Sequence, residues 1–236
     1  MIAAVSASDS AGPLASARHR WTVGLGLAAA QSALYFAIGN MHFLRSTELL
    51  RTRLDDAIAF LPWTAWCYLP FYGAIFVMAI AGFRHRVLFD RTARSVLLVM
   101  FVGALGHTLV RAEYPRPVLH PPFGGLSETF MAWVQSVDRP GNVFPSLHIA
   151  HTTMLSLLLV RDRPRLGRVA LAMATLLAIS TMTTKQHFVA DVVSGYALAL
   201  LGVWFAVRGL PPAAARPASA ATASPAVSAA WRAPPG

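Results

Sequence analysis

Long apolar runs alternate with short polar segments along the chain, and six of these runs have the character of membrane-spanning helices. They are Trp21–Ile38, Trp63–Phe83, Ser95–Val110, Ser146–Val160, Val169–Met182 and Phe188–Val207. A spanning helix needs about 20 apolar residues, with a lower limit near 17. The third, fourth and fifth runs are shorter unless polar residues at one end are included, and we interpret this shortfall as a functional end of those helices. The pattern predicts an all-α fold, a polytopic membrane bundle of about six transmembrane helices.

The composition agrees with a membrane environment. Hydrophobic residues make up 56% of the 236 residues and charged residues 13%, whereas soluble domains contain about 25% charged residues. The net charge of +10 would indicate nucleic-acid binding in a soluble protein, but here most arginines lie on one side of the alternating spans. They are Arg18, Arg20, Arg84, Arg86, Arg91, Arg94, Arg161, Arg163, Arg165, Arg168 and Arg208.

The positive-inside rule assigns this arginine-rich side to the cytosol. Six further arginines fall on the opposite side, namely Arg45, Arg51, Arg53, Arg111, Arg116 and Arg139. We therefore expect a multi-pass protein of the cell (inner) membrane with both termini in the cytosol, and we expect no nucleic-acid partner.

Three parts follow from this pattern. Residues 1–20 are expected to form a cytosolic N-terminal segment, residues 21–210 the six-helix membrane domain, and residues 211–236 a disordered, Pro/Ala-rich cytosolic tail. Cys67 is the only cysteine, which excludes an intrachain disulfide and a cysteine metal cluster.

Three polar segments fall on the side opposite the termini, and the first of them is Phe43–Pro62. Leu50, Leu54 and Ile58 recur there at helical spacing. This spacing predicts a short helix that lies in the membrane interface with its arginines on the polar face.

The second segment contains NVFPSLHIAHTT, which begins at Asn142. Pro145 suits the first turn of a helix, so Ser146 and His148 are expected at a helix N-terminus, where free backbone N–H groups and the helix dipole favour an anion. The alternative is a capped helix start with histidines that merely lie in the interface.

The third segment, TTKQHFVADVVSG, contains Lys185, the only lysine of the chain. His187 and Asp191 are four residues apart and share one face of a helix. A carboxylate in this position can accept the imidazole N–H, fix the tautomer and leave the other ring nitrogen free to attack. A structural ion pair is one alternative, and a metal site is another, although no second His/Glu pair is present to complete it.

The sequence RAEYPRP follows the third span and contains Arg111 and Arg116. No amphipathic pattern surrounds these arginines. A guanidinium group can bind phosphate oxygens through two N–H groups at once, so both are candidate phosphate ligands. Solvation at the surface or contact with lipid head groups is the alternative.

The order Arg-Pro, Pro-Ser-x-His and His-x-x-x-Asp resembles the three-part site of the type 2 phosphatidic acid phosphatase superfamily. The stretches FPSLH, TKQH and DDAIAFLPW are most similar to the branch of inositolphosphorylceramide synthase-like (inositolphosphotransferase) and related bacterial proteins. The resemblance implies a six-helix bundle and an enzyme of lipid metabolism.

The resemblance also implies a role for each matching residue. His187 would be the nucleophile that becomes a phosphohistidine, Asp191 would orient it, and His148 would be the general acid on the leaving group. Arg116 and Ser146 would hold phosphate oxygens.

Three positions depart from the family pattern. Leu109 stands where the first motif has a Lys or Arg, and Arg111 is the candidate replacement. Leu147 stands in place of the glycine of Pro-Ser-Gly-His. Thr181 stands in place of the arginine of the third motif, where Lys185 is the nearest cation.

We therefore expect a membrane phosphatase or phosphotransferase that acts on a lipid-linked phosphate at the extracytosolic face, with no metal and no other cofactor. Its partners would be a lipid phosphate or phospholipid substrate and the membrane lipids. The sequence leaves open hydrolysis or transfer to a lipid alcohol, the identity of the lipid, and the oligomeric state. The alternatives are a polytopic transporter and a phosphate-lipid-binding membrane protein without catalysis.

Overall fold

The computed structural model describes residues 14–39, 50–110, 112–138 and 141–210. The expected tail, most of the N-terminal segment and Arg111 lie outside these residues. The elements are α1 (Ala17–Gly39), α2 (Arg53–Ala57), the 3₁₀ helix η1 (Pro62–Cys67), α3 (Leu69–Gly82), α4 (Arg86–Leu109), α5 (Leu126–Val137), α6 (Leu147–Asp162), α7 (Pro164–Thr183) and α8 (Val189–Val207). The part of the chain that the structure describes is helical and contains no strand, which confirms the predicted fold class.

Five helical segments are long and apolar enough to cross a membrane. They are α1, η1 together with α3, α4, α7 and α8. The remaining predicted span, Ser146–Val160, corresponds to α6, which has only 16 residues. The expectation of about six spans is therefore roughly met, and the chain is a multi-pass membrane protein.

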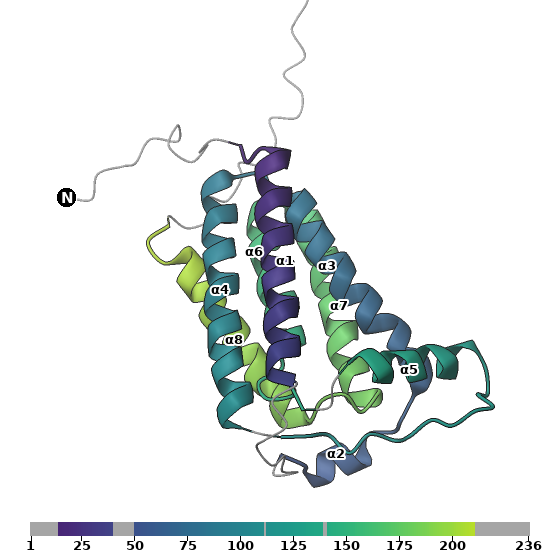
Figure 1. Ribbon diagram of the computed structural model, residues 1–236. Helices are drawn as coiled ribbons and strands as arrows, with labels where there is room; N and C mark the ends of the chain where they lie inside the picture. The colour runs from purple at the N-terminus through teal and green to yellow at the C-terminus, as the bar shows by residue number, and fades with distance from the viewer. Residues whose placement is uncertain (1–13, 40–49, 111, 139–140, 211–236) are drawn as a thin grey trace, which may run out of the picture.

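The helices run alternately up and down, so that α1 begins and α8 ends at the same end of the bundle (Figure 1). Helix α6 lies in the middle and packs against α3, α4, α7 and α8. Its side chains Met154, Leu158 and Leu159 are completely or almost completely buried. Although α6 is short for a spanning helix, its neighbours cover it, so little of the helix is exposed.

Two of the short predicted spans prove longer, and they extend at the opposite end from the one expected. Helix α4 starts at Arg86 rather than Ser95, and α7 starts at Pro164 rather than Val169. The added turns lie at the arginine-rich end, where long basic side chains reach the membrane surface while the backbone stays helical. Our interpretation of the shortfall as a polar functional end was wrong for these two helices.

The short helix predicted in the membrane interface covers only part of the segment whose apolar spacing indicated it, within the described residues. Helix α2 has only five residues, and its buried side chain is Asp55, at 2% exposure. Leu54, which the spacing places on the apolar face, is 64% exposed. Asp55 is buried because its carboxylate accepts two hydrogen bonds within 2.7 Å from Thr52 and one at 2.7 Å from the backbone N–H of Val189.

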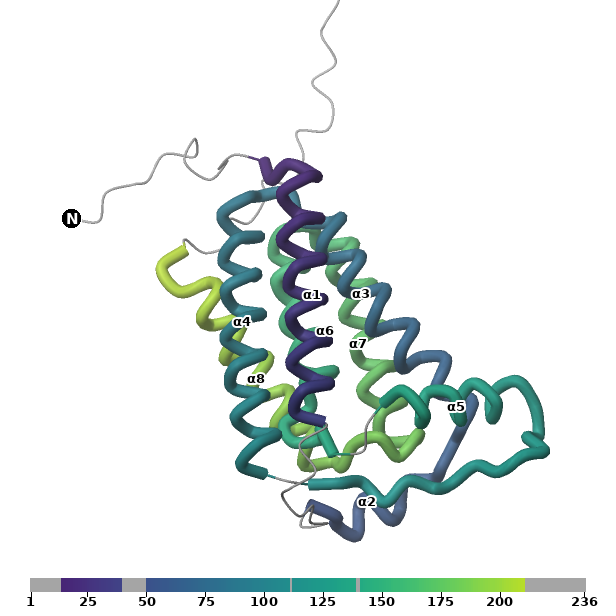
Figure 2. Tube along the Cα trace, in the orientation of Figure 1, coloured from purple at the N-terminus to yellow at the C-terminus, as the bar shows by residue number. Residues whose placement is uncertain are grey.

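Helix α5 was not predicted. It lies across the end of the bundle, beside η1 and in the same region as α2 (Figures 1 and 2). Met131 and Val134 face inward and are fully buried against a cluster that includes Ala65 and Tyr68. Together, α2, α5 and the loops between the spans cover the end of the bundle that is remote from the termini.

Candidate active site

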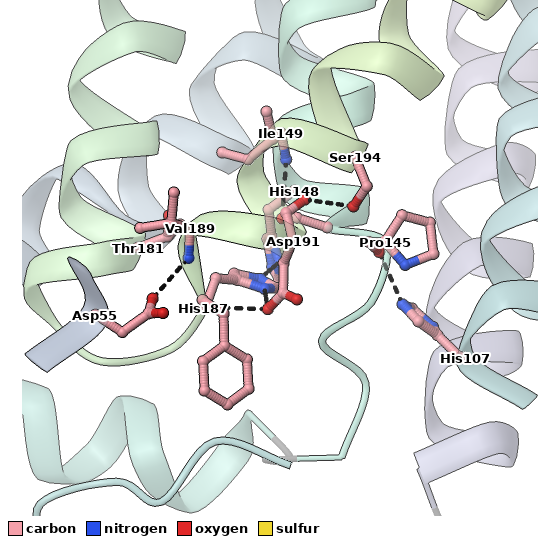
Figure 3. A network of polar contacts seen from close by, with 12 residues as sticks. Asp55, His107, Pro145, His148, Ile149, Thr181, His187, Val189, Asp191 and Ser194 are labelled. Carbon is pink, nitrogen blue, oxygen red and sulfur yellow. Dashed lines mark hydrogen bonds and ion pairs between the residues drawn. The ribbon is translucent and has the colours of Figure 1, made fainter. Parts of the chain in front are cut away.

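The predicted polar segments meet at this covered end of the bundle. Helix α6 begins there, α7 ends there, and residues 184–188 lead directly into α8 (Figure 1). Figure 3 shows His148, from the start of α6, beside His187 and Asp191, from the start of α8. The fold therefore brings together side chains that are about forty residues apart in the sequence.

His187 and Asp191 form the pair that their spacing predicts. Nδ1 of His187 lies 3.4 Å from Oδ2 of Asp191, and both side chains are buried. The same oxygen accepts the backbone N–H of Phe188 at 2.8 Å, so Asp191 also caps the first turn of α8. The backbone N–H of His187 donates to the carbonyl of Thr181 at 3.1 Å, which fixes the backbone at His187 relative to α7.

The second ring nitrogen of His187 faces His148. Nε2 of His187 lies 3.4 Å from Nδ1 of His148, and the two ring centres are 5.6 Å apart. His187 is 3% exposed, while His148 is only half-buried. One imidazole is therefore oriented by a carboxylate on its far side, and its other nitrogen faces the second imidazole.

The start of α6 is held against α8 by hydrogen bonds of the main chain. The N–H of Ser146 donates to the carbonyl of Asp191 at 3.2 Å. The hydroxyl of Ser146 accepts the N–H of Ile149 at 3.4 Å, so Ser146 is the N-cap of α6. One residue earlier, the carbonyl of Pro145 lies 3.0 Å from Nε2 of His107 on α4, which requires that nitrogen to carry the proton.

Two glycines allow this close approach. A Cβ atom at Gly195 would lie 2.7 Å from the carbonyl oxygen of Ser146 and 2.9 Å from Cβ of Ile149. A Cβ atom at Gly106 would lie 2.3 Å from Cδ of Pro145. Both neighbours are backbone or backbone-proximal atoms that cannot move aside, so only glycine fits at these positions.

A second polar network, which the sequence analysis missed, supports His148. The hydroxyl of Tyr68 lies 3.3 Å from Nδ1 and 3.2 Å from Nε2 of His148, and it lies 2.8 Å from Oδ2 of Asp138. Tyr68 is fully buried between η1 and α3. The residues around Tyr68 in the sequence are apolar and gave no indication of this role. Asp138 belongs to none of the motifs in the sequence.

Arg116 joins this second network. Its guanidinium group lies 3.5 Å from Oδ2 of Asp138 and also donates to the carbonyl of Asp138. Burial favours the neutral form of the Asp138 carboxyl group, but the positive charge of Arg116, together with His148 and the tyrosine hydroxyl bonds, outweighs it and lowers the pKa of Asp138 below its usual value. Asp138 is therefore a carboxylate that connects Arg116 to Tyr68.

Lys185 is the positive-φ residue of the turn before His187, with φ at 55°. Its ammonium group donates to the carbonyl of Asp55 at 2.6 Å and to the carbonyl of Ile58. Burial against this segment lowers the pKa of Lys185. In this structure Lys185 thus connects the turn to α2, next to the bond between Asp55 and Val189.

The predicted site residues therefore fall into three groups. His187, Asp191, His148 and Ser146 are brought together directly. Arg116 is directed to Asp138 and reaches His148 through Tyr68, and Lys185 is directed to α2. Arg111 lies outside the described residues.

The departures from the family motifs have different surroundings. Leu109 is 72% exposed at the end of α4, whereas Thr181 is fully buried and accepts the N–H groups of Gln186 and His187 with its carbonyl. Leu147 packs against Gly103 of α4, where a Cβ atom would lie 2.4 Å from its side chain. Among the described residues, no group of three or more His, Cys, Asp and Glu side chains is arranged to hold a metal ion.

Comparison with known proteins assigns the chain to a family. The sequence pattern of the PAP2 (type 2 phosphatidic acid phosphatase) superfamily matches residues 36–205, so the chain belongs to this superfamily. An uncharacterised protein of Methanocaldococcus jannaschii is 27% identical over 121 residues, which are 50% of each chain. The chain thus spans about half the length of this curated relative. No solved structure matches the chain.

Proposed function

We propose that this member of the PAP2 superfamily transfers the phosphoryl group of a lipid phosphate through a phosphohistidine at His187. The observation that carries the proposal is the position of Nε2 of His187, which faces His148 while Nδ1 faces Asp191. This arrangement is an imidazole nucleophile with a carboxylate orienter behind it and a second imidazole in front of it. The contact of 3.4 Å between His187 and Asp191 is long for a hydrogen bond, as is common when no substrate is bound.

In the first step, Nε2 of His187 attacks phosphorus, and the bond between phosphorus and the alcohol oxygen breaks. The imidazolium of His148 gives its proton to the departing oxygen. In the second step, water or a lipid alcohol attacks the phosphohistidine and gives its proton to His148. The N–P bond breaks, and both histidines return to their initial state.

The phosphoryl oxygens carry negative charge that fixed positive groups must offset. Helix α6, with Ser146 as its N-cap, begins in this region, and the backbone N–H groups at a helix N-terminus favour an anion. We propose that these groups bind phosphate oxygens, with Arg116, Lys185 and Arg111 as the predicted cations. For Arg116 and Lys185 this role requires the side chains to share or leave their bonds to Asp138 and α2.

The Tyr68–Asp138 pair supports the role of His148 in the proposal. A hydroxyl within 3.3 Å of both ring nitrogens restrains the imidazole, and the carboxylate of Asp138 holds that hydroxyl in turn. We assign Tyr68 and Asp138 as positioning residues that act through His148. The site would then contain two carboxylate-supported imidazoles with different tasks.

The orientation in the membrane follows from the arginines. The termini and the arginine-rich loops lie at one end of the bundle and the site at the other. The positive-inside rule would then place both termini in the cytosol and the site at the extracytosolic face of the cell membrane. The lipid substrate would enter from the outer leaflet.

The test uses purified protein in lipid nanodiscs with phosphatidic acid or lysophosphatidic acid as the substrate, with and without a lipid alcohol. Inorganic phosphate release indicates a phosphatase, and a new phospholipid found by mass spectrometry indicates a phosphotransferase. His187→Ala is the control and should remove both products. Equal product from His187→Ala and wild type would contradict the proposal, and so would the absence of product from every lipid phosphate.

A further inference from the structure

A cavity of about 200 Å³ opens on the His148 side of the site. Its wall is formed by the C-terminal half of α1, the start of α3, the end of α5 and the start of α6, and it includes His148 and His107 but neither His187 nor Asp191. In the proposed reaction, the nucleophile and the leaving group occupy opposite sides of phosphorus. The cavity therefore lies where the alcohol part of the substrate would be.

Most of the cavity wall is apolar and aromatic. Phe36 of α1, Leu69 and Tyr72 of α3, and Val137 of α5 contribute to it. Such a wall suits the first carbons of a lipid chain, because dispersion contacts between the chain and the apolar side chains stabilise the bound lipid. The exposed side chains Ser32 and Phe36 of α1 line the same cavity, so it continues to the outer face of this membrane helix.

One polar group in the wall lacks a partner. The amide oxygen of Gln31 is buried and accepts no hydrogen bond from any described residue, and the Gln31 side chain is only 9% exposed. Gln31 belongs to a helix that is apolar enough to span the membrane. A buried, unsatisfied acceptor at membrane depth is costly, and polar residues in such helices mark functional sites.

Several other polar groups of the cavity wall are bonded to one another. The Tyr35 hydroxyl bonds to Asp138, and the Asn142 amide donates to the Tyr35 carbonyl at 2.9 Å. Asp138 in turn accepts from Tyr68. The Gln31 oxygen is thus a buried acceptor in this cavity, without a partner among the described residues, that a ligand donor could satisfy.

We propose that this cavity is the subsite for the alcohol part of the substrate, and that Gln31 accepts a hydrogen bond from a second hydroxyl group beside the phosphate ester. The ligand class is a lipid phosphate whose alcohol carries a free hydroxyl near the phosphate. The first carbons of its chain lie along Phe36 and Tyr72 and leave the bundle beside α1. The same cavity receives the acceptor alcohol when the phosphoryl group is transferred. This inference rests on the proposed function for its chemistry, but the cavity itself can be tested without catalysis.

The kinetic test compares two substrates of equal chain length in nanodiscs. One is lysophosphatidic acid, which has a free hydroxyl beside the phosphate-bearing carbon, and the other is its 2-methoxy analogue, which cannot donate. Wild type should prefer the first by roughly tenfold in kcat/KM, as expected for one hydrogen bond to an otherwise unsatisfied acceptor. Gln31→Leu should reduce this preference to about one.

The matched control is Gln135→Leu on α5, which removes an amide of the same size outside the cavity. The Gln135 amide donates to the carbonyl of Pro117 at 2.9 Å, and its loss should leave the substrate preference at the wild-type value. A wild-type preference near one, or an unchanged preference in Gln31→Leu, would overturn the inference while the phosphohistidine chemistry still stood.

A binding test separates this inference from the proposed function. A cysteine at Ser32 in a Cys67→Ser background should be protected from N-ethylmaleimide by a monoacylglycerol, and less by the matching alkanol. Gln31→Leu should remove the difference between the two ligands. Absence of protection by either ligand would overturn the inference even if phosphate is released, and protection without phosphate release would support the cavity while the proposed function failed.

Discussion

The hydroxyl of Tyr68 lies 3.2 Å from Nε2 of His148. Tyr68, between η1 and α3, thereby restrains the imidazole ring of His148 on α6. The same hydroxyl lies 2.8 Å from the carboxylate of Asp138. If His148 gives a proton to the leaving group, this network matters most for substrates that need that proton.

Tyr68→Phe should therefore lower kcat/KM by about tenfold for a lipid phosphate, whose alkoxide leaving group must be protonated. For p-nitrophenyl phosphate, whose leaving group needs no proton, the loss should be smaller. Steady-state kinetics on both substrates measures the ratio. An equal loss on both would indicate that Tyr68 only supports the fold.

His148→Ala should show the same selectivity more strongly. We expect a loss of roughly 10²–10⁴-fold on the lipid phosphate, which is the usual contribution of a general acid, and a much smaller loss on p-nitrophenyl phosphate. If the variant loses both activities equally, the assignment of acid and nucleophile is wrong.

Lys185→Met tests two roles that predict different results. The bonds of Lys185 to the carbonyls of Asp55 and Ile58 predict that its loss loosens α2 and lowers thermal stability, with kcat changed by less than about tenfold. A direct contact with phosphate in the transition state would instead predict a fall in kcat of roughly 10²–10³-fold. Single-turnover kinetics and a thermal melt of the same preparation distinguish the two.

Gly195→Ala should destabilise the site end of the bundle. The added Cβ would lie 2.7 Å from the Ser146 carbonyl oxygen, so α6 and α8 must separate at the point where His148 and His187 meet. We expect a loss of about 1–3 kcal/mol in stability, as for overpacking elsewhere, with reduced activity. Gly26→Ala on α1 is the matched control, because a Cβ there meets nothing within 4 Å. This helical Gly→Ala change should increase the stability of the protein by about 0.5–1 kcal/mol.

The Arg116–Asp138 pair predicts a pH dependence of stability. The folded-state pKa of Asp138 is below the usual 3.8, so the folded protein binds fewer protons than the unfolded chain in this range. The stability contributed by Asp138 is therefore complete above about pH 4 and is lost as the pH falls through the folded pKa. Melting temperatures between pH 5 and pH 3 should fall less steeply for Asp138→Asn than for wild type, and identical slopes would show that the pair is not formed.

The topology can be tested independently of the chemistry. Single cysteines at Leu126 on α5 and Arg165 on α7 in a Cys67→Ser background lie at opposite ends of the bundle, and both positions are exposed. The first should react with an impermeant maleimide from outside intact cells, and the second only after permeabilisation. Reaction of both from outside would contradict the predicted orientation.

The sequence predicted the spans and the motif residues because each depends on local information. Apolar runs of a given length, a proline before a helix start and a His–Asp spacing of four can all be read without knowing the fold. The approach of His148 to His187, 3.4 Å apart across thirty-nine positions, was expected from their shared side of the membrane and from the resemblance to the superfamily's three-part site.

The residues that sequence reasoning missed act through long-range contacts. Tyr68 lies in an apolar run and is joined to His148 and Asp138 only by the fold. Asp55 lies in a segment with helical spacing of apolar residues, yet its carboxylate is buried because the N–H of Val189 requires an acceptor there. The polarity of a residue in the sequence does not show whether its carboxylate will be buried and hydrogen-bonded in the fold.

The central claim is that His187 forms a covalent phosphoryl intermediate. Wild-type protein should be incubated briefly with a lipid phosphate labelled with ³²P in the phosphate group, quenched in alkali and analysed by peptide mass spectrometry. The account predicts an alkali-stable, acid-labile phosphoramidate on His187 that forms rapidly in wild type and is absent in His187→Ala. In His148→Ala it should form much more slowly, because the departing alkoxide then lacks its proton donor. A label that persists in His187→Ala, or that maps to His148, would contradict it.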